Sequence, residues 1–186
     1  MTAQPVGAGH DEETAQRLTR LAELVRDVPD FPEPGVLFRD ITPVLADAEA
    51  LTVVATELAA LVGDADLVAG VEARGFLIGS AAAVVAGVGV VPVRKAGKLP
   101  RVAASRSYAL EYGEATLELP DGVVAPGTRV FVVDDVLATG GTAAATCALL
   151  ADVGATVTGF GTLVELAALG GRAALADTEV HALLTY

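Results

Sequence analysis

The sequence has no tryptophan and only one cysteine, one methionine and two lysines among its 186 residues. The single cysteine, Cys147, excludes an internal disulfide bond. The two histidines, His10 and His181, are too few to build a Ser-His-Asp triad or a His/Cys metal site. No charged segment followed by an apolar run and a cleavage site opens the chain, so we expect a cytoplasmic protein.

Basic residues are scarce: twelve stand against 24 acidic residues, and the formal net charge is −12. Such a chain repels phosphate backbones, so we expect no nucleic-acid partner and infer that any anionic ligand is held locally. Apolar types make up 53% of the residues, enough for one sizeable core. At about 100 to 200 residues per domain, we expect a disordered tail over 1–10 and a single domain over 11–186.

The longest uncharged stretch, 75–93, has nineteen residues, and a membrane span has to be considered for it. Four glycines and a proline weaken that interpretation, and Gly87 and Gly89 divide the stretch into a helix-length piece and a short β-branched piece. We therefore expect a buried helix followed by a buried strand, and no membrane partner.

Apolar runs with strand character alternate with segments of helical periodicity along the chain. The expected helices are 11–27, 47–61, one from about residue 76, and 142–150, and the expected strands are 67–71, 90–93, 130–133, 157–164 and 180–184. Fully apolar strands separated by helices predict an α/β fold with a doubly wound, mostly parallel sheet flanked by helices.

Two segments interrupt this alternation. The proline-rich segment 31–40 predicts a shaped loop, because its prolines lack donors and restrict the backbone. Over 94–119, alternating polar and apolar residues on both sides of Gly113 predict an inserted β-hairpin.

In parallel sheets, ligands bind at the carboxyl ends of the strands. The strand expected over 130–133 ends at two carboxylates, Asp134 and Asp135, which suit ribose hydroxyls or Mg²⁺. A helix-opening turn follows, whose glycines expose backbone N–H groups and whose threonines add hydroxyls: Thr139, Gly140, Gly141 and Thr142. This pattern predicts a phosphate cradle, although a simple capped helix after a strand would also explain it.

Two other strand ends carry charge. Glu72 and Arg74 follow the strand over 67–71, where they suit a second anionic group or a surface ion pair. After the strand over 90–93, the loop 92–101 holds both lysines of the chain, Lys95 and Lys98. With Arg94 and Arg101 this loop is either a site for a polyanion or a solvated face, and the scarcity of cations elsewhere favours the site.

With these loops in view, the chain resembles the type I phosphoribosyltransferases. Residues 132–142 (VVDDVLATGGT) resemble that family's motif for 5-phosphoribosyl-1-pyrophosphate, PRPP. Four further segments resemble the adenine-specific branch: 31–43 (FPEPGVLFRDITP), 70–76 (GVEARGF), 93–100 (VRKAGKLP) and 110–113 (LEYG). The resemblance covers 26–172, most of the chain, with the motifs in the family's order.

The resemblance implies purine salvage, in which an enzyme converts adenine and PRPP to AMP and pyrophosphate with Mg²⁺, in a homodimer. It also implies the type I phosphoribosyltransferase fold, with an N-terminal helix and a small hood over 11–45 and a flexible hairpin lid over 94–119. Alternatives are a phosphoribosyltransferase for xanthine or hypoxanthine, or a PRPP-sensing regulator without turnover.

The resemblance assigns a role to each loop. Asp134 and Asp135 would meet the ribose, and Mg²⁺ would be held mainly by PRPP, with or without these two carboxylates. The 5′-phosphate would rest on Ala138, Thr139, Gly140, Gly141 and Thr142. Pyrophosphate would bind at Glu72, Ala73, Arg74, Arg94, Lys95 and Lys98, with an unusual peptide bond just before Arg74.

Adenine would stack on Phe38, while backbone groups of Leu37 and Arg39 read its Watson–Crick edge. In the lid, Tyr112 would close the site and Glu111 would handle a purine proton, unless Glu111 is an ordinary hairpin glutamate. Two lid residues depart from the family's pattern, Arg106 at a usually acidic position and Arg101 where a glycine usually follows the proline.

Overall fold

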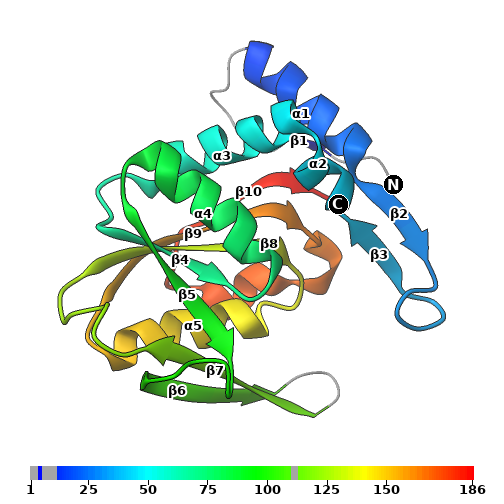
Figure 1. Cartoon of the computed structure of the whole chain (residues 1–186). Coiled ribbons are helices and arrows are strands. Elements are labelled where there is room, and N and C mark those ends of the chain that lie inside the picture. Colours follow the sequence, from blue (N-terminus) through cyan, green and yellow to red (C-terminus); the bar gives the residue numbers. More distant parts are fainter. Residues whose placement is uncertain (1–3, 6–11, 110–112) are drawn as a thin grey trace.

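The computed structural model describes residues 4–5, 12–109 and 113–186. Within these ranges eight strands form one sheet, in the order β1-β10-β9-β8-β4-β5-β7-β6 (Figure 1). They are β1 (Gln4–Pro5), β4 (Leu67–Val71), β5 (Gly89–Lys95), β6 (Val102–Ala109), β7 (Glu114–Pro120), β8 (Arg129–Leu137), β9 (Thr156–Glu165) and β10 (Val180–Thr185). The five central strands are parallel, so the expected doubly wound, mostly parallel sheet is confirmed.

Helices cover both faces of this sheet (Figure 1). They are α1 (Glu12–Leu24), α2 (Thr42–Ala46), α3 (Ala48–Val62), α4 (Arg74–Ala86) and α5 (Gly141–Asp152), and the short 3₁₀ turns are η1 (Ala167–Leu169) and η2 (Gly171–Leu175). One core lies between the sheet and α1, α3 and α4, where Leu58 and Ile78 are fully buried. The other lies between the sheet and α5, around Leu149 and Phe160.

The uncharged stretch 75–93 forms most of α4 and β5, as expected, and Gly87 ends the helix in the left-handed region at φ 73°. In the described part of the chain no helix is long and apolar enough to cross a membrane. The expectation of a buried helix is wrong for one face of α4, because Leu77, Val84 and Val85 are 57%, 80% and 53% exposed. Hydropathy alone does not separate a buried helix face from an apolar face left open.

The N-terminal region differs most from expectation. Helix α1 ends at Leu24 rather than near residue 27, and β2 (Arg26–Pro29) pairs antiparallel with β3 (Leu37–Asp40) in a separate two-stranded sheet. The expected loop over 31–40 is therefore wrong for its last four residues, which follow the prolines and keep their N–H donors. Within the expected tail, Gln4–Pro5 pair with β10.

The inserted hairpin is confirmed. Strands β6 and β7 pair antiparallel, and β7 joins the sheet through Arg94 and Lys95 of β5. Figure 1 shows this hairpin at the bottom of the view and the β2–β3 sheet at the right, with the carboxyl end of β8 between them.

Candidate active site

Two buried carboxylates lie at the centre of the candidate site. Asp134 and Asp135 are 8% and 7% exposed. They lie inside β8 rather than at its end, because β8 continues to Leu137 along β9 whereas its pairing with β4 stops at Val133. This early stop opens the sheet beside both carboxylates. Burial, and next the neighbouring Asp135, raise the pKa of Asp134 well above its ordinary value.

Arg74 links these carboxylates to the base side of the site. It is the first residue of α4, and its Nε lies 2.5 Å from Oδ2 of Asp135. Its guanidinium carbon also lies 5.3 Å from the ring centre of Phe38. The peptide bond between Glu72 and Ala73 is cis. We expected the unusual bond one position later, between Ala73 and Arg74. The chain can pass this close because residue 75 is glycine, where a Cβ would lie 2.8 Å from Asp134 Oδ1.

The expected phosphate cradle forms a cavity of about 80 Å³ at the start of α5. Its lining includes all five cradle residues, Ala138, Thr139, Gly140, Gly141 and Thr142. Gly140 adopts φ 83°, and an added Cβ there would lie 2.4 Å from the carbonyl oxygen of Gly171. The backbone of η2 therefore packs directly behind the cradle. Backbone N–H groups at the start of a helix, in a small pocket, suit a phosphate group.

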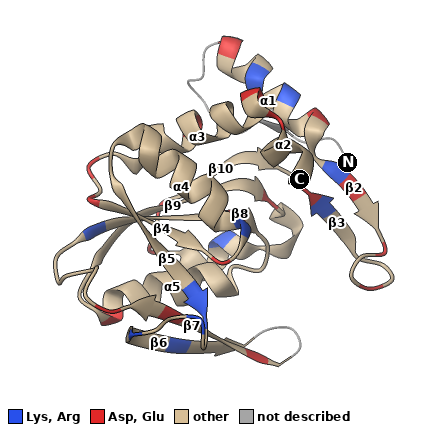
Figure 2. Ribbon diagram, viewed as in Figure 1, with Lys and Arg blue, Asp and Glu red and all other residues tan. Residues whose placement is uncertain are grey.

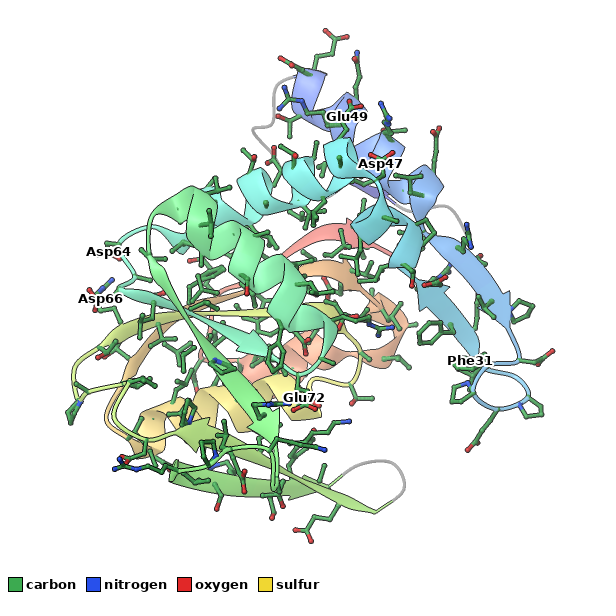
Figure 3. All side chains as sticks on the ribbon, in the orientation of Figure 1. Phe31, Asp47, Glu49, Asp64, Asp66 and Glu72 are labelled. Atoms are coloured by element: carbon green, nitrogen blue, oxygen red, sulfur yellow. The ribbon has the colours of Figure 1, made fainter. Side chains whose placement is uncertain are left out.

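A second cavity, of about 510 Å³, lies where pyrophosphate is expected and is lined by Glu72, Ala73, Arg74, Lys95, Tyr108, Ala115, Leu117, Asp134, Asp135 and Thr142. The Glu72 carboxylate accepts hydrogen bonds from the backbone N–H of Lys95 at 3.0 Å and from Arg94 Nε at 3.2 Å. Although burial acts to raise it, these contacts lower the pKa of Glu72 overall. Glu72, labelled in Figure 3, therefore orients the neighbouring cationic loop, and its contact with Arg94 is the ion pair considered from the sequence.

The structure brings only part of the cationic loop to this cavity. Lys95 lines it, whereas Arg94 turns toward Glu72 and the ring of Phe76, 5.8 Å away. Lys98 is exposed and lies outside the lining, and Arg101 pairs with Asp121 at 2.5 Å. Figure 2 shows basic positions at the start of α4 and at the end of β5.

The third cavity, of about 600 Å³, lies where the base is expected, beside Phe38. The hood contributes Val36, Leu37, Phe38 and Arg39, and Phe31 supports Phe38 edge-on at 5.1 Å between ring centres. The lining residues that sequence reasoning missed include Tyr108, Leu166 and Leu169. Leu166 directly follows β9, so the strand-end rule applied to that strand would have found it.

The lid is described in part. Glu111 and Tyr112 lie outside the described residues. Arg106, one of the two unusual residues, forms a two-pronged ion pair with Asp152 at the end of α5, at 2.8 and 3.0 Å. Tyr108 shares a hydrogen bond of 2.8 Å with the Thr142 hydroxyl in the phosphate cradle. Strand β6 of the hairpin is therefore tied to α5 at both ends of that helix.

The carboxylates of the site suit a Mg²⁺ ion that arrives bound to a substrate. Among the described residues no group of three or more His, Cys, Asp or Glu side chains is arranged to hold a metal. Asp134 lines the small cavity at the start of α5, and Asp134 and Asp135 both line the cavity of about 510 Å³. Mg²⁺ commonly binds through one or two carboxylates together with substrate phosphates.

Comparison with known proteins gives a consistent result. A family described as phosphoribosyl transferase domain matches residues 44–179. The chain is 57% identical over 171 residues to an adenine phosphoribosyltransferase of Clavibacter sepedonicus, covering 90% of each chain. It is 58% identical over 166 residues to that of Mycolicibacterium vanbaalenii, covering 89% of this chain and 95% of the relative.

Solved structures agree. A Thermoanaerobacter pseudethanolicus adenine phosphoribosyltransferase superposes with a TM-score of 0.87 at 44% identity, over 91% of this chain and 99% of that one. The Saccharomyces cerevisiae enzyme, solved with an iminoaltritol bisphosphate and adenine, gives 0.85 at 34% identity, over 91% and 99%.

Proposed function

The chain belongs to the adenine phosphoribosyltransferase family, and on that premise we propose that it transfers the 5-phosphoribosyl group of PRPP to adenine, giving AMP and pyrophosphate. This reaction salvages a free purine base. The observation that carries the proposal is the meeting of three cavities, each suited to one part of the reactants, around Asp134, Asp135 and Thr142.

The arrangement supports one placement of PRPP. The 5′-phosphate lies in the cradle at the start of α5, where N–H groups and the helix dipole favour an anion. Asp134 and Asp135 accept hydrogen bonds from the ribose hydroxyls. The pyrophosphate lies against Arg74 and Lys95, and Glu72 holds the backbone of Lys95 in place.

This placement fits the charge changes of the reaction. Breaking the bond between the anomeric carbon and pyrophosphate leaves positive charge on the ribose ring and adds negative charge to the leaving group. The buried carboxylates face the ribose, and the cations Arg74 and Lys95 face the leaving group, so each developing charge meets a fixed opposite charge.

Adenine fits the base cavity between Phe38 and Leu166. Aromatic and aliphatic walls stack on a flat base, and backbone groups of Leu37 and Arg39 supply donors and acceptors for its Watson–Crick edge. Its N9 then faces the anomeric carbon and forms the new bond as pyrophosphate leaves.

In this proposal Glu111 handles a purine proton after the lid closes, and Tyr112 helps to exclude water. Both roles rest on the family motif at 110–113. Replacing Glu111 with Gln should lower kcat by about 10²- to 10⁴-fold while the KM for PRPP stays near that of the parent. An unchanged kcat would exclude the proton-handling role.

We infer that the enzyme uses Mg²⁺. Asp134 and Asp135 are the carboxylates that would hold the ion together with PRPP oxygens. When bound, Mg²⁺ supplies charge neutralisation for the departing pyrophosphate.

We also infer a homodimer formed through the open face of α4. Leu77, Val84 and Val85 expose apolar surface, and after Arg74 the helix carries no charge. Two copies with a net charge of −12 each approach most easily through an uncharged face. Sedimentation should show a dimer for the parent and a monomer for Val84→Asp combined with Val85→Asp, and a monomeric parent would refute the dimer.

We place the reaction in the cytoplasm. PRPP and AMP carry several negative charges and do not cross membranes unaided, so their enzyme acts where they are made.

The proposed function is tested by supplying PRPP and Mg²⁺ with adenine, hypoxanthine, guanine, xanthine or orotate in turn and following pyrophosphate release. We expect release with adenine and much slower release with the other bases. Release with another base only would replace the substrate assignment. Binding of PRPP without release for any base would favour a PRPP sensor.

A further inference from the structure

Strands β2 and β3, the part of the hood that carries Phe38, form a two-stranded sheet of their own, separate from the main sheet. Strands β2 and β3 pair only with each other in the part of the chain that the structure describes. A two-stranded hairpin is marginally stable by itself in water. The position of Phe38 over the site therefore depends on side-chain contacts that hold β3 against the rest of the domain.

Arg39 makes the most buried of these contacts. Side chains alternate along a strand, so Arg39 points to the opposite side of β3 from Phe38. It is 7% exposed, and its guanidinium carbon lies 4.1 Å from the ring centre of Tyr186. The same guanidinium pairs with Asp27, the residue opposite it on β2. Arg39 thus joins both strands of the hood to Tyr186.

Tyr186 is itself fixed to the other wall of the base cavity. Its backbone N–H donates to the Glu165 carbonyl at 2.9 Å, and its carbonyl accepts from Ala167 N–H at 3.0 Å. These two bonds bracket Leu166, which lines the base cavity together with Phe38. The Arg39–Tyr186 contact therefore connects the two walls of the base cavity, the wall that carries Phe38 and the wall that carries Leu166.

We propose that Tyr186 is a positioning residue for adenine. The ring of Tyr186 holds Arg39 in place and so sets the separation between Phe38 and Leu166. This inference rests on the proposed function. The Tyr186 hydroxyl is buried and has no hydrogen-bond partner among the described residues. The Tyr186 ring, and not its hydroxyl, therefore makes the contact that holds Arg39.

The test compares Tyr186→Leu with Tyr186→Phe as the matched control. Leucine keeps apolar bulk but removes the cation–π contact, so the KM for adenine should rise by roughly 2- to 30-fold. The KM for PRPP should change less than about twofold, because the phosphate and pyrophosphate cavities do not touch the Arg39–Tyr186 contact. Tyr186→Phe keeps the ring and should behave like the parent in both constants.

A second variant, Arg39→Met, breaks the Arg39–Tyr186 contact from the hood side and should give the same selective rise in the KM for adenine. It also keeps the test decisive if Tyr186→Leu does not fold. The inference is overturned if the folded variants keep the parental KM for adenine, if both KM values rise together, or if Tyr186→Phe matches Tyr186→Leu. A parent that does not consume adenine would instead refute the proposed function.

Discussion

At the scale of single residues, Asp134 has a position that costs stability in the free protein. It is buried beside Asp135, and its pKa is raised above the ordinary value of 3.8. The folded state therefore holds the proton more tightly than the unfolded state does. The contribution of Asp134 to stability is greatest below about pH 4 and falls as the pH rises through the raised pKa.

Asp134→Asn should therefore stabilise the free protein at pH 7 while lowering its activity. The amide does not ionise, so the cost of keeping a carboxyl group with a raised pKa at this buried position is removed at pH 7, and the amide oxygen can still accept the bond that Asp135 N–H now donates to Asp134 at 2.9 Å. Each 1 kcal/mol gained raises Tm by roughly 2 to 4 °C in a domain of this size. Thermal unfolding should show the gain at pH 7 and little difference at pH 3.5, and a lower Tm at pH 7 would contradict this account.

At the scale of elements, η2 forms the back wall of the phosphate cradle. A Cβ on Gly171 would lie 2.3 Å from the carbonyl oxygen of Ala138, a contact that only a backbone shift relieves. The shape of the cradle is therefore set by a 3₁₀ turn more than 30 residues away in sequence. The turn is itself held by Arg172, which forms two bonds of 2.7 Å with Glu165.

Gly171→Ala should raise the KM for PRPP at least about tenfold, because small displacements of substrate-positioning groups are costly. Gly170→Ala is the matched control. It faces open space at φ 68°, so it should lower stability by about 1 kcal/mol and leave the KM for PRPP unchanged. Equal effects of the two variants on that KM would show that η2 does not shape the cradle.

The hairpin provides a second prediction at this scale. Arg106 holds β6 to α5 through Asp152, and this contact raises the pKa of Arg106 and lowers that of Asp152. Arg106→Glu places two like charges together and should speed amide hydrogen exchange in β6 severalfold, less so at high salt. The charge swap, Arg106→Asp with Asp152→Arg, should restore slow exchange. Unchanged exchange in Arg106→Glu would mean that the pair does not hold the hairpin.

At the scale of the whole molecule, the parallel strands themselves and the main binding loops were predictable, whereas the order of the strands in the sheet was not. Apolar runs mark buried strands, and the strand-end rule pointed to Asp134, Asp135 and Arg74. The pairing of β2 with β3 was not predictable by these rules, because prolines at 29, 32 and 34 argued against strands there.

Contacts between distant segments also escaped prediction. Arg106 and Asp152 are 46 residues apart, and Arg39 meets Tyr186 across most of the chain. Pattern and propensity describe local structure, whereas such pairs exist only once the sheet order is set. The roles of individual site residues likewise stay predictions that rest on geometry and family resemblance.

The central claim is that the buried carboxylate pair orients PRPP for transfer to adenine. The most direct measurement is the amount of AMP and pyrophosphate formed from adenine, PRPP and Mg²⁺ by the parent and by the folded variant Asp134→Asn with Asp135→Asn. We expect equal amounts of the two products from the parent, and a rate more than tenfold lower from the variant, since each charged hydrogen bond contributes about 1.5 to 3 kcal/mol. Absence of AMP from the parent reaction, or parental turnover by the variant, would contradict the account.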